Sequence, residues 1–177
     1  MAKPRVFVSS TFYDLKYVRD NIHTFLTERG FETIFNERGD IPYDKNITLQ
    51  SNCYETVKYC DLLIGIIGNR FGTEAESDSE ISVTMAEILT AVENNKQVFL
   101  FVENETWHEN GFYEQNVNNS SIVYKANVKI HRFISEIKQK KQNNVLHPFI
   151  SVNEIIDFLQ AQFSGFVLSK KQKGTKK

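Results

Sequence analysis

Apolar positions along the chain repeat with two alternating periods, which indicates strands that alternate with helices. Short apolar runs predict strands at 5–9, 31–35, 61–67, 97–102 and 145–150. Apolar residues spaced three or four apart predict helices at 13–29, from Asn46 or Thr48 to Cys60, around Ile81–Val92, at 124–142 and at 152–163. The segments Gly68–Glu80 and Glu103–Ser121 lack either period and are interpreted as surface loops.

Five strands that alternate with five helices predict an α/β fold. The run from Asp61 to Ile67 is continuously apolar, as expected for a central parallel strand covered on both faces. We therefore expect a flavodoxin-like, doubly wound, five-stranded parallel sheet with strand order 2-1-3-4-5 and helices on both faces. A single domain over residues 1–168 would be followed by a basic, disordered tail at 169–177.

Composition and charge narrow the possible partners. The 177 residues are 41% hydrophobic with a net charge of −1, so the chain as a whole gives no reason to expect nucleic acid. The lysines of the tail indicate a solvated end or linker, with binding to nucleic acid or anionic lipid as the alternative. No apolar segment approaches a signal peptide or a membrane span, so a cytoplasmic protein without a membrane partner is expected.

Several classes of site are not expected. Cys53 and Cys60 lie seven residues apart on a predicted helix, about 10 Å along its axis, which is too far for a disulfide, so both are expected to be reduced core residues. The chain has no CxxC or Cys/His cluster, so no metal site is expected. It has no GxSxG, Walker A or GxGxxG sequence, which leaves hydrolase, P-loop and dinucleotide-oxidoreductase interpretations without support, and no cofactor is expected.

Ligands of such sheets bind at the carboxyl edge, where the strand order reverses, here between strands one and three. Three segments meet there: the turn Ser9–Phe12, the loop Gly68–Gly72 and the helix start Ser82–Glu87. Hydroxyls and free helix N–H groups suit phosphate or ribose, although Ser10 or Thr11 could simply cap the helix. The candidate substrate-binding residues are Ser9, Ser10, Thr11, Phe12, Asn69, Arg70, Phe71, Gly72, Ser82 and Thr84.

Glu87 is the candidate catalytic residue. It lies off the apolar stripe of its helix, so the alternative is an ordinary solvated glutamate. Arg70 could pair with a phosphate or neutralise the acidic loop that follows it. In the predicted loop, Trp107 could be a lid or a local anchor, and the scattered His23, His131 and His147 are interpreted as structural.

Three motifs occur in order: Val6–Leu15 (VFVSSTFYDL), Cys60–Gly72 (CDLLIGIIGNRFG) and Ser82–Glu87 (SVTMAE). They resemble a TIR-like domain family catalogued as a domain of unknown function, over roughly residues 5–103. The segment Arg38–Ile47 is similar to the loop after the second strand of TIR domains. The resemblance extends to TIR NADases and nucleoside deoxyribosyltransferases, in which a glutamate at the position of Glu87 acts on an N-glycosidic bond.

The resemblance implies an NAD glycohydrolase or ADP-ribosyl cyclase of bacterial anti-phage defence, with Phe12 or Phe71 stacked on a base. The implied partners are NAD or a related nucleotide, a second copy of the chain and a downstream effector protein. Ser82, Val83 and Thr84 stand where TIR NADases carry a motif with Trp and Cys. A TIR-like interaction module without chemistry, or a deoxyribosyltransferase-like enzyme, is the alternative.

Overall fold

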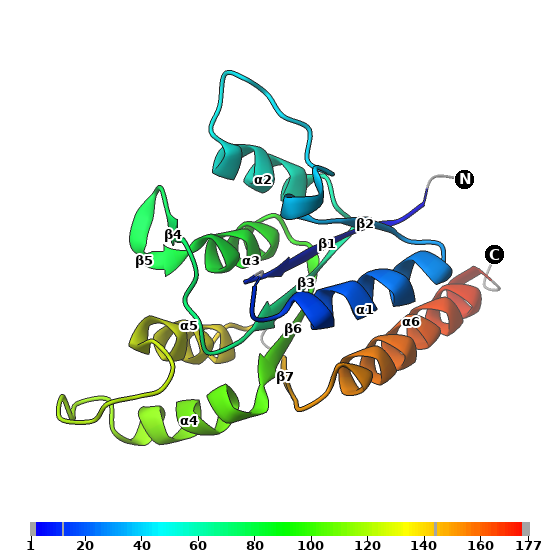
Figure 1. Cartoon of the computed structure of the whole chain (residues 1–177). Helices are drawn as coiled ribbons and strands as arrows, with labels where there is room; N and C mark the ends of the chain where they lie inside the picture. Colours follow the sequence, from blue (N-terminus) through cyan, green and yellow to red (C-terminus); the bar gives the residue numbers. More distant parts are fainter. Residues whose placement is uncertain (1–2, 12, 144, 175–177) are drawn as a thin grey trace.

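A computed structural model describes residues 3–11, 13–143 and 145–174 (Figure 1). Along the chain the elements are β1 (Arg5–Ser10), α1 (Lys16–Glu28), β2 (Glu32–Ile34), η1 (Asn36–Arg38), α2 (Leu49–Lys58), β3 (Leu62–Ile67), β4 (Glu74–Ala75), β5 (Asp78–Ser82), α3 (Val83–Glu93), β6 (Gln97–Glu103), α4 (Asn104–Gln115), α5 (Val128–Lys138), β7 (Leu146–Phe149) and α6 (Val152–Gly174). Phe12 lies outside the described residues.

The main sheet has five parallel strands in the order β2-β1-β3-β6-β7. Counted among these five strands alone, this is the expected order 2-1-3-4-5, so the predicted fold is confirmed. The order reverses between β1 and β3, which pair from Val6 with Leu62 to Ser10 with Ile66. The carboxyl ends of these two strands therefore meet at the switch point, where a ligand site is expected.

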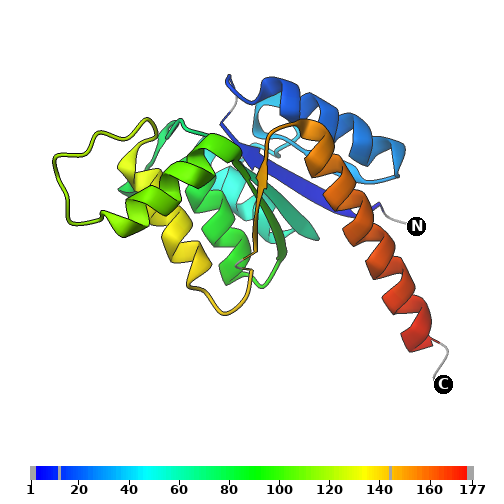
Figure 2. The ribbon, with the colours of Figure 1, turned by 90° about the horizontal axis from the view of Figure 1, so that it is seen from below.

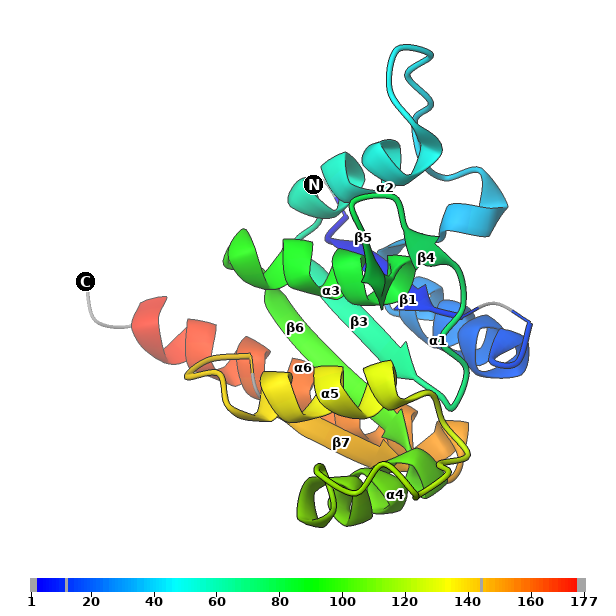
Figure 3. The same cartoon turned by 90° about the vertical axis from the view of Figure 1, so that its left-hand side faces the viewer.

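Successive side chains of each strand point to opposite faces of the sheet and pack into two separate hydrophobic cores. Val8, Ile64 and Phe101 pack with α1 and α6 on one face of the sheet. On the other face, Phe7 and Leu63 pack with α2, α3 and α5, which Figure 3 shows together in front of the sheet. Cys53 and Cys60 are buried in this second core as free thiols, as predicted.

One glycine determines how closely α3 approaches the sheet. A Cβ on Gly65 of β3 would lie 2.6 Å from Leu100 Cδ2 and 3.0 Å from Ile88 Cδ1. A larger residue there would press on the side chains of Leu100 on β6 and Ile88 on α3, because contacts this short are repulsive. The helix that carries Glu87 is therefore seated directly on the central strands.

The segment 103–121, interpreted as a loop, instead contains helix α4. Its buried residues are Thr106, Asn110 and Tyr113, so the buried face has helical spacing but mostly polar side chains. An apolar period could not reveal such a helix. Trp107 lies on this helix, packs against the core and has Lys138 Nζ 4.3 Å from its ring centroid, which makes it a local anchor.

Helix α4 is joined to α5 around a fully buried imidazole. His131 Nε2 lies 3.0 Å from Glu109 Oε2, and its ring stacks on Tyr113 with centroids 5.3 Å apart. Glu109 also accepts the backbone N–H groups of Lys125 and Ala126. This cluster, named here the His131 cluster, ties the loop after α4 to both helices and gives His131 the structural role predicted for it.

Further boundaries differ from expectation, and helix α5 spans Val128–Lys138 rather than 124–142. The predicted loop at 68–80 contains β4 and β5, which pair as an antiparallel hairpin. Its side chains are mostly polar and exposed, so the sequence shows no apolar alternation there that would predict strands. Helix α1 begins at Lys16 rather than residue 13. Helix α6 continues to Gly174 instead of ending at Phe163, and its last turns project past the sheet (Figure 2). None of the described helices is both long and apolar enough to span a bilayer.

Candidate functional site

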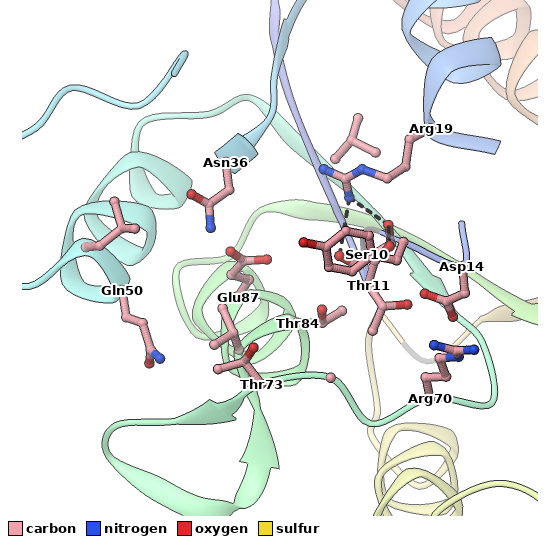
Figure 4. Close-up of a pocket in the computed structure, with 15 residues that line it drawn as sticks. Ser10, Thr11, Asp14, Arg19, Asn36, Gln50, Arg70, Thr73, Thr84 and Glu87 are labelled. Atoms are coloured by element: carbon pink, nitrogen blue, oxygen red, sulfur yellow. Dashed lines mark hydrogen bonds between the residues drawn. The ribbon is translucent and has the colours of Figure 1, made fainter. Parts of the chain in front are cut away.

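A pocket of about 510 Å³ opens at the switch point (Figure 4). Its volume lies within the usual range for small-molecule sites. Of the predicted site residues, Ser10, Thr11, Arg70, Gly72, Thr84 and Glu87 line it. The lining also includes Val8, Tyr13, Asp14, Arg19, Asn36, Leu49, Gln50, Thr73 and Val83, which the sequence did not single out.

The two predicted loops meet as expected. Gly72 adopts φ +78°, and a Cβ there would lie 2.9 Å from Thr11 Cγ2. Glycine is therefore required both by the left-handed backbone and by the close approach of the loop to the β1 turn. Thr11 Oγ1 is buried and has no hydrogen-bond partner in the described structure, which is unusual for a buried hydroxyl.

Helix α3 starts without an intervening loop, because Ser82 is both the last residue of β5 and the N-cap of α3. Its Oγ accepts the N–H of Met85 at 3.3 Å. Ser82 therefore positions the helix and does not line the pocket. Five residues further on, Glu87 is only 4% exposed. The solvated alternative for Glu87 is wrong, since the side chain faces the pocket.

Ser9 holds the carboxylate of Glu87. Its Oγ donates a hydrogen bond of 2.5 Å to Glu87 Oε2, and the pair is buried. A hydrogen bond to an ionised group is stronger than a neutral one, and it offsets part of the cost of burying a carboxylate. The hydroxyl of Ser9 is thus directed at Glu87, although a substrate contact was predicted for it.

The charge of Glu87 raises the pKa of two side chains on the neighbouring helix α2. Burial, and then the nearby Glu87 carboxylate, raise the pKa of Tyr54 to about 12. The same two causes, in the same order, raise the pKa of the Cys53 thiol to about 12. A negative charge disfavours a second one nearby, so both groups stay neutral at physiological pH.

Arg19 engages the next residue of β1. The guanidinium is 2% exposed; Nη1 donates to Ser10 Oγ at 2.6 Å and to Ser10 O at 3.3 Å. It also lies over the Phe35 ring, 4.9 Å from its centroid. Ser10 Oγ donates in turn to Thr11 O at 2.8 Å. Ser9 and Ser10 thus hold a carboxylate and a guanidinium at the rim of one pocket.

A second carboxylate, Asp14, lines the pocket near Arg70 (Figure 4). A Cβ on Gly68 would lie 3.3 Å from Asp14 Oδ2 and 3.0 Å from Glu103 Oε2, so the two carboxylates converge above the end of β3. Burial and then the charge of Asp14 raise the pKa of Glu103, although the N–H of Asn69 opposes this by bonding to Glu103.

Two predicted residues, Asn69 and Phe71, do not line the pocket. The backbone of Asn69 serves Glu103. Phe71 packs against the core beneath Lys129 Nζ, 5.1 Å from the ring centroid, so the stacking surface expected there does not face the pocket. Tyr13, 88% exposed, is the aromatic residue that lines the pocket among those described.

One of the missed residues did leave a signal in the sequence. Arg19 sits four residues after Leu15 and three before Ile22, so it interrupts the buried stripe of α1 with a charge. A charged residue at such a position needs a polar neighbour in the fold. Asn36 and Gln50 had no comparable signal in the sequence. Asn36 lies just after β2, and Gln50 lies in the first turn of α2, so a polar residue is ordinary at either position.

The central chemical feature of the site is the Glu87 carboxylate, which is bonded by the Ser9 hydroxyl and lies at a pocket lined by polar, charged and apolar side chains. Such a carboxylate can accept hydrogen bonds from ribose hydroxyls or face a developing positive charge. Among the described residues, no group of three or more His, Cys, Asp or Glu side chains is arranged to hold a metal ion.

The fold and the pocket define a doubly wound α/β protein with a buried carboxylate at its switch point. The chain belongs to the family described as "Domain of unknown function (DUF4062)", whose model matches residues 5–164. A search of curated proteins gives no match. Among solved structures, the chain is similar to the CMP N-glycosidase BcmB of Clostridium botulinum, with 17% identity and a TM-score of 0.47 over 89% of this chain and 98% of that one.

Proposed function

We propose that the pocket binds a nucleotide and that Glu87 is the catalytic residue for cleavage of its N-glycosidic bond. The observation that carries this proposal is the placement of Glu87: a carboxylate 4% exposed, bonded by Ser9, at the rim of a pocket of about 510 Å³. Burying a carboxylate is costly for stability, and such costs are characteristic of functional sites.

The chemistry follows from the charge that develops as the bond breaks. The C1′–N bond lengthens, its electron pair leaves with the base, and the sugar becomes an oxocarbenium ion. A fixed carboxylate stabilises that cation more than the neutral sugar of the ground state, and this difference accelerates the reaction. Water then adds to C1′ and loses a proton.

For the substrate we propose NAD, with nicotinamide as the leaving group. The proposal follows the resemblance of the three motifs to TIR domains. Thr11 and Thr84, which line the pocket beside Glu87, supply hydroxyls for ribose or phosphate oxygens. Arg70 is exposed at the pocket and supplies a planar cation for a phosphate.

The test is release of nicotinamide from NAD by the purified chain, compared with Glu87→Gln. Glutamine keeps the shape and still accepts the hydrogen bond from Ser9, but it lacks the charge. We expect turnover to fall by at least ~100-fold, the scale of one lost electrostatic group. Glu93→Gln, an exposed glutamate at the end of the same helix, is the matched control and should turn over like the wild type.

Because the resemblance also implies self-association, activity is measured across protein concentrations together with the mass in solution. Turnover that survives Glu87→Gln would contradict the role of Glu87. Absence of turnover in every assembled state would contradict the enzyme and favour the interaction module.

A further inference from the structure

Two side-chain amides among the described residues line the pocket, and they differ in what they bond. Gln50 Nε2 donates to Glu74 O, and Gln50 Oε1 accepts the N–H of Glu76. The same oxygen also accepts the hydroxyl of Tyr54. Asn36 is half-buried, and its amide makes no hydrogen bond in the part of the chain that the structure describes. An amide has two N–H donors and an acceptor oxygen, so those of Asn36 are left for a ligand.

The register of β2 against β1 places Asn36 beside Ser9. The two strands are parallel, Phe7 lies opposite Ile34, and the residue after Ile34 keeps an extended backbone. Two residues further along each strand, Asn36 therefore lies opposite Ser9, one strand spacing or about 4.8 Å away. Residues two apart point to the same face, and Phe7 and Ile34 point into the core beneath α3. Asn36 thus belongs to the face from which Glu87 enters.

The residue before Asn36 fixes this position. Phe35 is fully buried, and its N–H donates to Asp40 Oδ2 at 3.0 Å. The guanidinium of Arg19 lies over its ring, 4.9 Å from the centroid. Figure 4 shows the Asn36 amide directed toward the Glu87 carboxylate. An amide and a carboxylate from two different elements are therefore presented to the same part of the pocket.

We propose that Asn36 is a specificity-determining residue that recognises, together with Glu87, the 2′-hydroxyl of a ribose. The site then takes ribonucleotides in preference to 2′-deoxyribonucleotides. This inference rests on the proposed function and names its substrate class. The 2′-hydroxyl is carried by the carbon next to C1′, where Glu87 acts on the glycosidic bond. A group that lies within reach of both side chains in such a complex is this hydroxyl.

The hydrogen-bonding capacities of the three groups are complementary. The Glu87 carboxylate only accepts, and it has lone pairs beyond the one that Ser9 occupies. A hydroxyl donates once and accepts as well, so it donates to Glu87 and accepts an N–H of Asn36. A 2′-deoxyribose fills the same space without bonding either group. Because polar groups left unpaired in a closed complex cost free energy, the site discriminates against it.

The experiment crosses two substrates with three variants. The substrates are NAD and its analogue in which hydrogen replaces the 2′-hydroxyl of the nicotinamide riboside. Asn36→Ala removes the amide, and Asn36→Leu removes its polar atoms while keeping a side chain of similar length. Asn153→Ala changes an exposed asparagine of α6 that does not line the pocket, and it is the matched control.

In both Asn36 variants we expect kcat/KM for NAD to fall by about 10-fold, the scale of one lost hydrogen bond. For the analogue kcat/KM should stay nearly unchanged, since it lacks the partner of the amide. The two sugars differ in intrinsic reactivity, but each comparison is made within one substrate, so this difference cancels. If the wild type does not turn the analogue over, its inhibition constant against NAD is compared instead.

A structural role would give a different pattern, since a distorted pocket would impair both substrates. An equal loss for NAD and the analogue, or no loss for NAD in either Asn36 variant, overturns the inference while leaving the proposed function intact. If the wild type cleaves no NAD in any assembled state, the proposed function fails and this inference fails with it.

Discussion

Helices α3 and α5, which pack on the same face of the sheet, bury titratable groups that serve different roles. Glu87 on α3 and His131 on α5 are both nearly inaccessible to solvent, and each is bonded to a polar side chain, Ser9 and Glu109 respectively. His131 is enclosed by aromatic rings and ties helices together, whereas Glu87 adjoins a cavity. Burial alone therefore does not mark a functional residue; burial beside an open volume is the more informative combination.

The largest effect should separate activity from stability at Glu87. Glu87→Gln is expected to lose at least ~100-fold in turnover while changing the free energy of unfolding by less than about 1 kcal/mol, since the bond from Ser9 has a remaining acceptor. Urea denaturation of both proteins measures the second quantity. A large loss of stability would mean that Glu87, like His131, is chiefly structural.

The reverse is expected in the His131 cluster. His131→Ala removes a fully buried ring that contacts Tyr113 and Tyr124 and leaves Glu109 without one partner. We expect a loss of about 3 kcal/mol, the scale of a large-to-small core substitution. Urea denaturation again provides the measurement, and nicotinamide release by the folded fraction should match the wild type. A loss below about 1 kcal/mol would contradict the structural role.

Acid pH should weaken the same cluster. Burial lowers the pKa of His131 below its ordinary value of 6.5, and this outweighs the opposing effect of Glu109. Below about pH 6.5 the imidazole is therefore protonated in the unfolded chain but still neutral in the folded chain. The free energy of unfolding falls as the pH drops through this range. His23, whose pKa is also lowered by burial, contributes in the same direction.

The check compares urea midpoints at pH 7.5 and pH 5.5. The wild type should lose stability at the lower pH, and His131→Gln should show a weaker dependence. What remains combines His23, which acts in the same direction, with Glu103, whose raised pKa acts in the opposite direction. An unchanged slope in His131→Gln would remove His131 from this explanation.

The smallest expected effect reports the charge of Glu87 without reference to any substrate. In Glu87→Gln the pKa of Tyr54 should fall from about 12 toward its ordinary value of 10, only part of the way, because burial is the larger cause. Titration of the Tyr54 ring resonance by NMR measures the shift, and Glu93→Gln should leave it unchanged. An unshifted pKa would show that Glu87 carries no charge near α2.

The strand order could be predicted because the apolar runs of β1, β3 and β6 are long and their crossovers constrained. Helix α4 could not, since Thr106 and Asn110 occupy its buried face. At the site, the sequence indicated the loops that meet but not which side chains they direct inward. Ser9 and Ser10 prove to be engaged by Glu87 and Arg19, and Phe71 turns into the core. Such choices depend on packing between elements far apart in the chain.

The continuity of β5 with α3 through Ser82 has a consequence for how this domain tolerates length changes. Each residue added to a helix rotates the later side chains by about 100° around its axis, so one insertion between Ser82 and Glu87 would swing the carboxylate out of the pocket. The hairpin turn at Glu76–Ser77 lies outside that helix and is exposed, so insertions there leave the position of Glu87 intact. Relatives of this chain should therefore vary in length at the hairpin turn and keep a fixed spacing from the cap to the glutamate.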